Sequence, residues 1–102
     1  MALNPKHKRY LRNIAHHIRP CITTGKEGLK ESILMDIHEA LERDELIKVK
    51  IGKGELHRKD AVEIIREKVQ AEVVQLLGRN VLLFRKRVRD SNIHFPTQNL
   101  SP

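Results

Sequence analysis

The chain contains few of the residue types on which base-stacking and metal-binding sites depend. Its aromatic side chains are Tyr10, Phe84 and Phe95, and it has no Trp. This scarcity argues against a protein that stacks unpaired bases on rings across an open sheet. Cys21 is the only cysteine, which excludes an internal disulfide and a cysteine-based zinc site. A reducing cytoplasm is the simplest location for such a chain.

Long apolar runs and N-terminal acidic residues are also missing. The longest apolar stretches, such as 81–84, are far too short to span a bilayer, and the basic N-terminus lacks the apolar region of a secretory signal. We therefore expect no membrane partner. Residues 1–26 contain no Asp or Glu, although several cations lie there. These cations are Lys6, Lys8, Arg9, Arg12, Arg19 and Lys26.

Length and net charge set further bounds. A chain of 102 residues can bury one hydrophobic core but not two. The net charge of +7 at pH 7 makes an anionic partner the default expectation. The sign of the charge alone does not separate RNA, DNA and anionic lipid.

An amphipathic helix is predicted at the N-terminus, with Asn4 as its N-cap, Pro5 in its first turn and Pro20 ending it. Apolar residues recur there at helical spacing and form one stripe: Leu11, Ile14, Ala15 and Ile18. The opposite side carries a basic set, made of Arg9, Arg12 and His16 with Lys8 and Arg19 flanking them.

The middle of the chain alternates predicted strands and helices. A strand at 21–24 leads through two glycines into a helix over 29–41, which has an apolar stripe and an acidic outer face. A strand at 46–51 then alternates apolar residues with Lys48 and Lys50, which predicts one buried and one wet face.

The last third of the chain predicts a helix and a hairpin. The helix faces inward with Ala61, Ile64, Ile65 and Val69, and Asp60 and Glu63 have the spacing of a capping box. Strands 73–77 and 81–84 are joined by a tight turn, and both are apolar on successive residues. Both faces of this hairpin should therefore be covered.

The order of elements, a helix followed by β-α-β-α-β-β, predicts an α/β fold with a four-stranded mixed sheet. Right-handed crossovers imply a mostly parallel sheet in which the last strand returns antiparallel. We expect two helices on one face of this sheet. The first helix must bury its stripe elsewhere, on the opposite face or at an edge.

Four ordered sequence blocks point to a known family. They are residues 8–12 with 15–17, 25–29, 45–50 and 78–85. The set resembles the YhbY family, the bacterial stand-alone CRM domain. The resemblance implies an RNA-binding domain at 1–86 that associates with precursors of the large ribosomal subunit and assists their maturation.

The resemblance also carries expectations about the fold and the tail. It implies a fold similar to the C-terminal domain of translation initiation factor three, with an added N-terminal helix. Residues 87–102 match no part of the family, and we interpret them as a basic, then polar, flexible tail.

The loop Gly25-Lys26-Glu27-Gly28 is the strongest candidate binding element. Two glycines three apart let the backbone approach a partner closely, and Lys26 beside an acid-free segment suits phosphate. The resemblance identifies this loop with the family's GxxG loop, although Glu27 is acidic where a neutral or basic residue is expected. The alternative is a helix-entry turn that needs glycine for a positive φ.

Other cations extend the predicted RNA surface. They are Lys8, Arg9, Arg12, His16, Arg19, Lys48, Lys50, Arg79, Arg85 and Lys86. The basic side of the first helix could be an ordinary solvated face, but the segregation of charge favours a binding surface. Lys48 and Lys50 could equally protect an edge strand against aggregation.

No catalytic residue, metal site or cofactor is predicted. His16 and His17 point about 100° apart on a helix, so they do not easily share a metal. No general base can be placed beside Cys21. We expect a non-enzymatic monomer without a small-molecule substrate. The alternative function is a protein-interaction module that docks its acidic second helix on a basic ribosomal protein.

Overall fold

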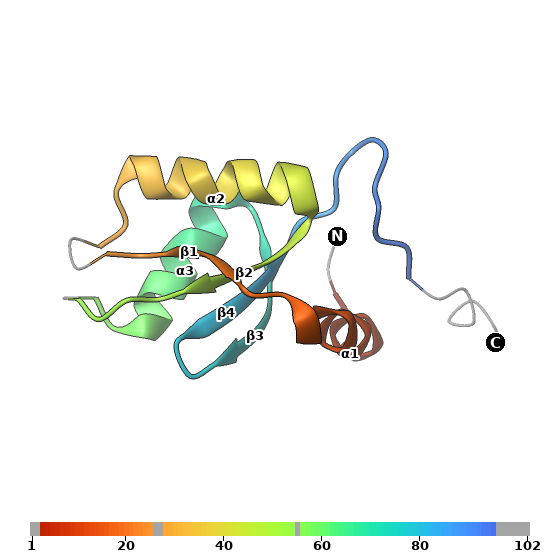
Figure 1. Cartoon of the computed structure of the whole chain (residues 1–102), viewed down its shortest axis with the longest axis horizontal. Helices are drawn as coiled ribbons and strands as arrows, with labels where there is room; N and C mark the ends of the chain where they lie inside the picture. The colour runs from red at the N-terminus through yellow and green to blue at the C-terminus, as the bar shows by residue number, and fades with distance from the viewer. Residues whose placement is uncertain (1–2, 26–27, 55, 96–102) are drawn as a thin grey trace.

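The computed structural model describes residues 3–25, 28–54 and 56–95. Its elements follow the predicted order (Figure 1). They are α1 (Pro5–Ile14), a 3-10 turn η1 (Ala15–His17), β1 (Pro20–Thr23), α2 (Glu31–Asp44), β2 (Leu46–Lys50), α3 (Arg58–Val69), β3 (Glu72–Leu77) and β4 (Asn80–Phe84).

The four strands form one mixed sheet in the order β1-β2-β4-β3. As predicted, the sheet is mixed, and the last strand runs antiparallel to the other three, which share one direction. Only β1 and β2 pair in parallel, because β4 lies between β2 and β3 and is antiparallel to both. All four apolar residues of β4 are buried, so this strand occupies the centre, where both faces are covered.

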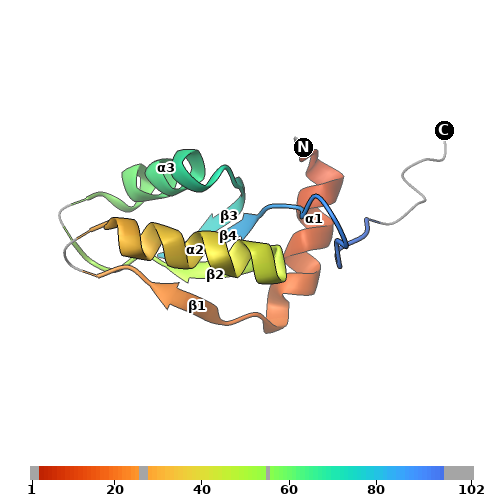
Figure 2. The same cartoon turned by 90° about the horizontal axis from the view of Figure 1, so that it is seen from above.

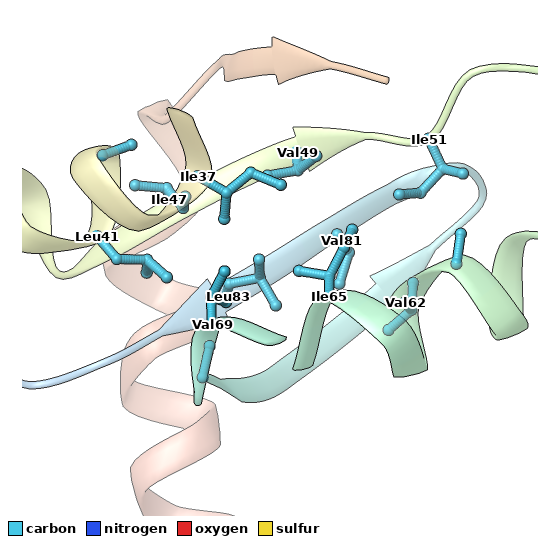
Figure 3. Packing of buried hydrophobic residues seen from close by; sticks show 13 residues of the cluster. Ile37, Leu41, Ile47, Val49, Ile51, Val62, Ile65, Val69, Val81 and Leu83 are labelled. Carbon is cyan, nitrogen blue, oxygen red and sulfur yellow. The ribbon is translucent and has the colours of Figure 1, made fainter. Parts of the chain in front are cut away.

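The main core lies between one face of the sheet and the helices α2 and α3 (Figures 1 and 2). Figure 3 shows side chains from both helices meeting those of β2 and β4. The contributing residues include Ile37, Leu41, Ile47, Val49, Ile65, Val81 and Leu83. The predicted apolar stripes of the two helices are thus the surfaces that they bury.

Helix α1 packs on the opposite face of the sheet, one of the two places predicted for it. Leu11 and Ala15 are buried in a second cluster with Leu46, Leu82 and Phe84. Asn4 caps the helix as predicted, because its Oδ1 accepts a hydrogen bond of 2.8 Å from the His7 N–H.

The end of α1 and the start of α3 differ from the positions predicted from the sequence, and each difference has a local cause. The α-helix stops at Ile14, not at Pro20, since η1 tightens the chain and Ile18 is already extended before Pro20 opens β1. Helix α3 begins at Arg58, and its N-cap is His57, whose Nδ1 accepts from the Lys59 N–H at 3.2 Å. The capping box predicted further along is therefore wrong.

The segment after β4 is held by one buried carboxylate. Glu45 is 0% exposed and accepts hydrogen bonds from the Arg87 N–H (2.8 Å), the Ser91 hydroxyl (2.6 Å) and the Asn92 N–H (2.6 Å). Burial alone raises the pKa of this carboxyl. The three hydrogen bonds and the charge of Arg87 outweigh burial, so the pKa lies below its ordinary value.

An aromatic contact fastens the end of the same segment to α1. The Phe95 ring lies 4.3 Å from the His7 ring, 5.7 Å from the Tyr10 ring and 5.8 Å from the Phe84 ring, measured between centroids. These contacts lie beyond residue 86, where the resemblance predicts that the domain ends.

Candidate nucleic-acid interface

Three connections meet where β1, β2 and β3 end. We call this region the loop end; its described residues are 24–25 and 28–30, 51–54 and 56–57, and 78–79. The register pairs Lys50 with both Thr23 and Asn80, which brings the ends of the strands together. The loop end and α1 lie at opposite ends of the sheet (Figures 1 and 2). Carboxyl ends of strands are the usual ligand-binding edge of open α/β sheets.

The two glycines of the predicted binding loop serve different purposes. The Gly28 N–H donates to the Gly25 carbonyl at 3.2 Å, and the φ of Gly28 is +88°, which favours glycine. Gly25 lacks a positive φ, and no described atom lies within 4 Å of where its Cβ would stand. A helix-entry turn therefore explains Gly28 but not Gly25, which is exposed and has open space around its Cβ position.

The two central residues of that loop, Lys26 and Glu27, lie outside the described residues. The predicted phosphate contact of Lys26 and the effect of the acidic Glu27 stay predictions.

Thr24 locks the first two connections of the loop end together. This residue is 4% exposed; its N–H donates to the Lys50 carbonyl, and its Oγ1 accepts from the Gly52 N–H, both at 2.9 Å. A Cβ on Gly52 would lie only 2.1 Å from the Thr24 carbonyl oxygen. The close approach of these two backbones therefore requires glycine at position 52.

Two arginines tie the third connection to the same region. Arg79 donates from Nε to the Ile51 carbonyl (2.7 Å) and from Nη2 to the Gly52 carbonyl (2.8 Å). Arg58 donates from Nη1 to the Gly78 carbonyl at 2.6 Å. Arg79 was predicted as an RNA contact, and the structure places it at the loop end as a clamp on the neighbouring backbone.

An open groove of about 410 Å³ lies beside the glycine loop, and sequence reasoning missed it. Its lining residues are Lys53, Gly54, Leu56, His57, Arg58 and Arg79. No motif in the sequence marks residues 52–54 or His57 as part of a site. The signal that could have found them is topological, because parallel strands β1 and β2 must end at the same edge.

The basic residues of α1 form a separate region. Arg9 and His16 are exposed, whereas Lys8 and Arg12 are partly buried. Lys8 and Arg12 lie one helical turn apart, on the flank away from Tyr10 and its contact with Phe95. We do not expect the α1 cations to converge with the loop end on one point, because α1 and the loop end lie at opposite ends of the sheet (Figure 2).

Lys48 and Lys50 lie on the face of the sheet that α1 partly covers. Lys48 is half-buried and Lys50 is exposed. The suggestion that they protect an edge strand is wrong, because β2 is an inner strand between β1 and β4. Their position is instead between the two basic regions.

Arg85 is occupied within the fold, at the end of the sheet opposite the loop end. Its side chain is 17% exposed; Nη1 donates to the Val69 carbonyl (2.6 Å), and Nη2 donates to the His38 carbonyl and Glu42 Oε2 (3.1 Å each). The neighbouring Lys86 is exposed, and so is Arg19, which directly precedes β1.

Catalytic and metal chemistry find no support in the part of the chain that the structure describes. No three of its His, Cys, Asp and Glu residues gather as a metal site. Burial raises the pKa of the Cys21 thiol, which disfavours a thiolate nucleophile. Within the same residues, no helix has the length and apolar character needed to traverse a bilayer.

The fold and the loop end define a small α/β domain with a basic, glycine-bearing edge. Residues 3–85 match the CRS1 / YhbY (CRM) domain, and the chain belongs to this family. It is 34% identical over 95 residues to "Probable RNA-binding protein YqeI" of Bacillus subtilis, covering 92% of this chain and 99% of that protein. It is 38% identical over 85 residues to an "RNA-binding protein" of Haemophilus influenzae, covering 81% and 85%.

A solved structure agrees with the fold. The solution structure of the hypothetical protein SAV1595 from Staphylococcus aureus, described as a candidate RNA-binding protein, matches with a TM-score of 0.78 and 34% identity. The match covers 93% of this chain and all of that one. The relatives are named as RNA-binding proteins and not as enzymes.

Proposed function

We propose that the chain is an RNA-binding protein that associates with precursors of the large ribosomal subunit through ribosomal RNA and assists their assembly. Family membership and the names of the relatives support the RNA partner. The ribosomal precursor is the family's implied partner, extended here to this chain. We further propose that the protein acts as a cytoplasmic monomer.

The observation that carries the proposal is the geometry of the loop end. Two glycine-containing connections are locked together by Thr24, Gly25 leaves its backbone uncovered, and a basic groove adjoins them. Backbone N–H groups and lysines in such a place suit phosphates. Lys26 is proposed as the main cation of the loop, with Lys50 and the α1 cations extending the surface.

Salt dependence tests this proposal with a short ribosomal RNA fragment. If three to five phosphates are contacted, log K should fall against log[salt] with a slope of about −2 to −4. Lys26→Glu should weaken binding strongly while changing the free energy of unfolding by less than roughly 0.5 kcal/mol. Lys68→Glu, an exposed change in α3, is the control. Affinity that does not vary between 50 and 300 mM salt would contradict the proposal.

Sedimentation tests the ribosomal part. The protein should migrate with large-subunit precursors in a sucrose gradient of cell lysate, and crosslinking followed by sequencing should recover ribosomal RNA. Recovery of other RNA alone would reject the ribosomal partner and leave RNA binding intact.

One observation keeps the protein-docking alternative in view. Met35 on α2 is 55% exposed, and the exposed acidic residues Glu31, Asp36 and Glu39 surround it on the same helix. Exposed Met beside carboxylates suits a basic protein surface. Ribosomal proteins that remain bound after complete nuclease digestion would favour this alternative.

A further inference from the structure

The groove beside the glycine loop adjoins a second, smaller hollow. Gly25 and Gly28 line that hollow together with Gly54 and Leu56, and the last two residues also line the groove. A Cβ on Gly28 would stand 4.0 Å from Leu56 Cδ1. Leu56 therefore separates the glycine loop from the groove. An RNA strand that lies on the glycine loop can continue past Leu56 into the groove.

Two of the three lysine and arginine side chains that line the groove bind backbone carbonyls. Arg58 and Arg79 donate to the carbonyls of the loop end, as described above. Lys53 is exposed, and no hydrogen bond or ion pair joins it to any described residue. Glu55 lies outside the described residues. An exposed lysine in a concave basic site suits phosphate, because its ammonium group is a compact positive charge.

The other groove residues do not suit phosphate alone. Leu56 is 37% exposed, and an apolar side chain contributes nothing to an anion. The exposed His57 ring is held in one orientation, because its Nδ1 accepts from the Lys59 N–H. In the neutral ring Nε2 then carries the proton and is a donor. A fixed flat ring beside an apolar surface fits a base or a ribose.

We propose that this groove binds one unpaired nucleotide, with its phosphate on Lys53 and its base against Leu56 and His57, next to the backbone held by the glycine loop. The inference rests on the proposed function and narrows its substrate to RNA with unpaired residues. A base that is paired and stacked within a helix is not free to enter the groove.

Two RNA probes of equal length test the inference, a hairpin with an unpaired loop and a fully paired blunt duplex. The variants are Lys53→Ala and His57→Asn, and Lys68→Ala is a control of the same charge change on the exposed side of α3. Asn keeps a side-chain acceptor at the N-cap of α3, so the helix is preserved. Thermal melts verify that each variant folds.

We expect Lys53→Ala to lose roughly three- to tenfold in affinity for the hairpin, with a salt slope smaller by about 0.7. His57→Asn should lose roughly two- to fivefold with an unchanged slope, because it removes a ring contact to the base and no lysine or arginine contact to phosphate. Neither variant should change binding to the duplex by more than Lys68→Ala does.

Two results would overturn the inference. One is a Lys53→Ala variant that binds the hairpin as Lys68→Ala does, and the other is an equal loss for both probes. Failure of the unmodified protein to bind either probe is a different result, because it rejects the proposed function itself.

Discussion

Both ends of the sheet carry basic side chains, but these side chains make different contacts. At the end where β4 leaves the sheet, arginines pair within the molecule: Arg85 with Glu42, and Arg87 with the carbonyls of Glu42 (3.2 Å) and Arg43 (2.8 Å). At the loop end, Lys53 has no partner among the described residues. We therefore expect a binding surface to be located by the cations left unpaired and not by the number of cations.

The largest expected effect comes from removing the Glu45 carboxylate, which holds the segment that follows β4. Glu45→Ala leaves the partly buried N–H donors of Arg87 and Asn92 without their acceptor, so we expect a loss of about 2–4 kcal/mol in the free energy of unfolding. Urea denaturation measures this loss. Glu39→Ala, an exposed change on α2, should cost less than about 0.5 kcal/mol. RNA affinity of the folded Glu45→Ala protein should not change.

The dependence of stability on acidic pH tests the contribution of the Glu45 carboxylate separately. Because the pKa of Glu45 is lowered by folding, its charge stabilises the folded state above the ordinary value of 4.5. This contribution is lost as the pH falls from that value through the lower pKa of the folded state. Glu45→Gln should therefore show a weaker decline in stability than the unmodified protein over this acidic range. Parallel curves for the two proteins would contradict the assignment.

At the loop end, Gly52→Ala tests whether the two connections are locked together. The added methyl group collides with the Thr24 carbonyl, so the backbones must separate. We expect a cost of roughly 1–3 kcal/mol in stability together with weaker RNA binding, measured by urea denaturation and fluorescence anisotropy. Unchanged RNA affinity in the folded variant would show that the lock does not shape the site.

The smallest expected effects on stability distinguish the roles of the two glycines of the binding loop, Gly25 and Gly28. Gly28→Ala should cost about 1 kcal/mol in stability, because alanine disfavours a φ of +88°. Gly25→Ala should change stability by less than about 0.5 kcal/mol but weaken RNA binding, since its methyl group would point into open space. The reverse pattern would assign Gly25 a purely structural role.

Local patterns were sufficient to predict much of the fold. The period of the apolar residues identified the helices and strands, and Asn4 before Pro5 identified the start of α1. The position of β4 between β2 and β3 was not predictable in this way. It depends on which strand can bury both faces, and that is a property of the assembled sheet.

The site was predicted less completely than the fold. Gly25 and Gly28 stood out because of their spacing, but Lys53 and His57 join them only through strand order and register. Sequence alone also suggested Arg79 and Arg85 as RNA contacts, but both guanidinium groups donate to backbone carbonyls within the fold. Partners that are distant in sequence decide whether a charge is available, and local patterns do not reveal them.

The outer edge of β1 has a consequence for handling the protein. This strand is short, opens with Pro20, which has no N–H, and its register with β2 shifts between Pro20 and Ile22. A brief, irregular border that lacks a donor is a poor template for a neighbouring molecule's strand. Concentrated solutions should accordingly resist fibril formation from this side.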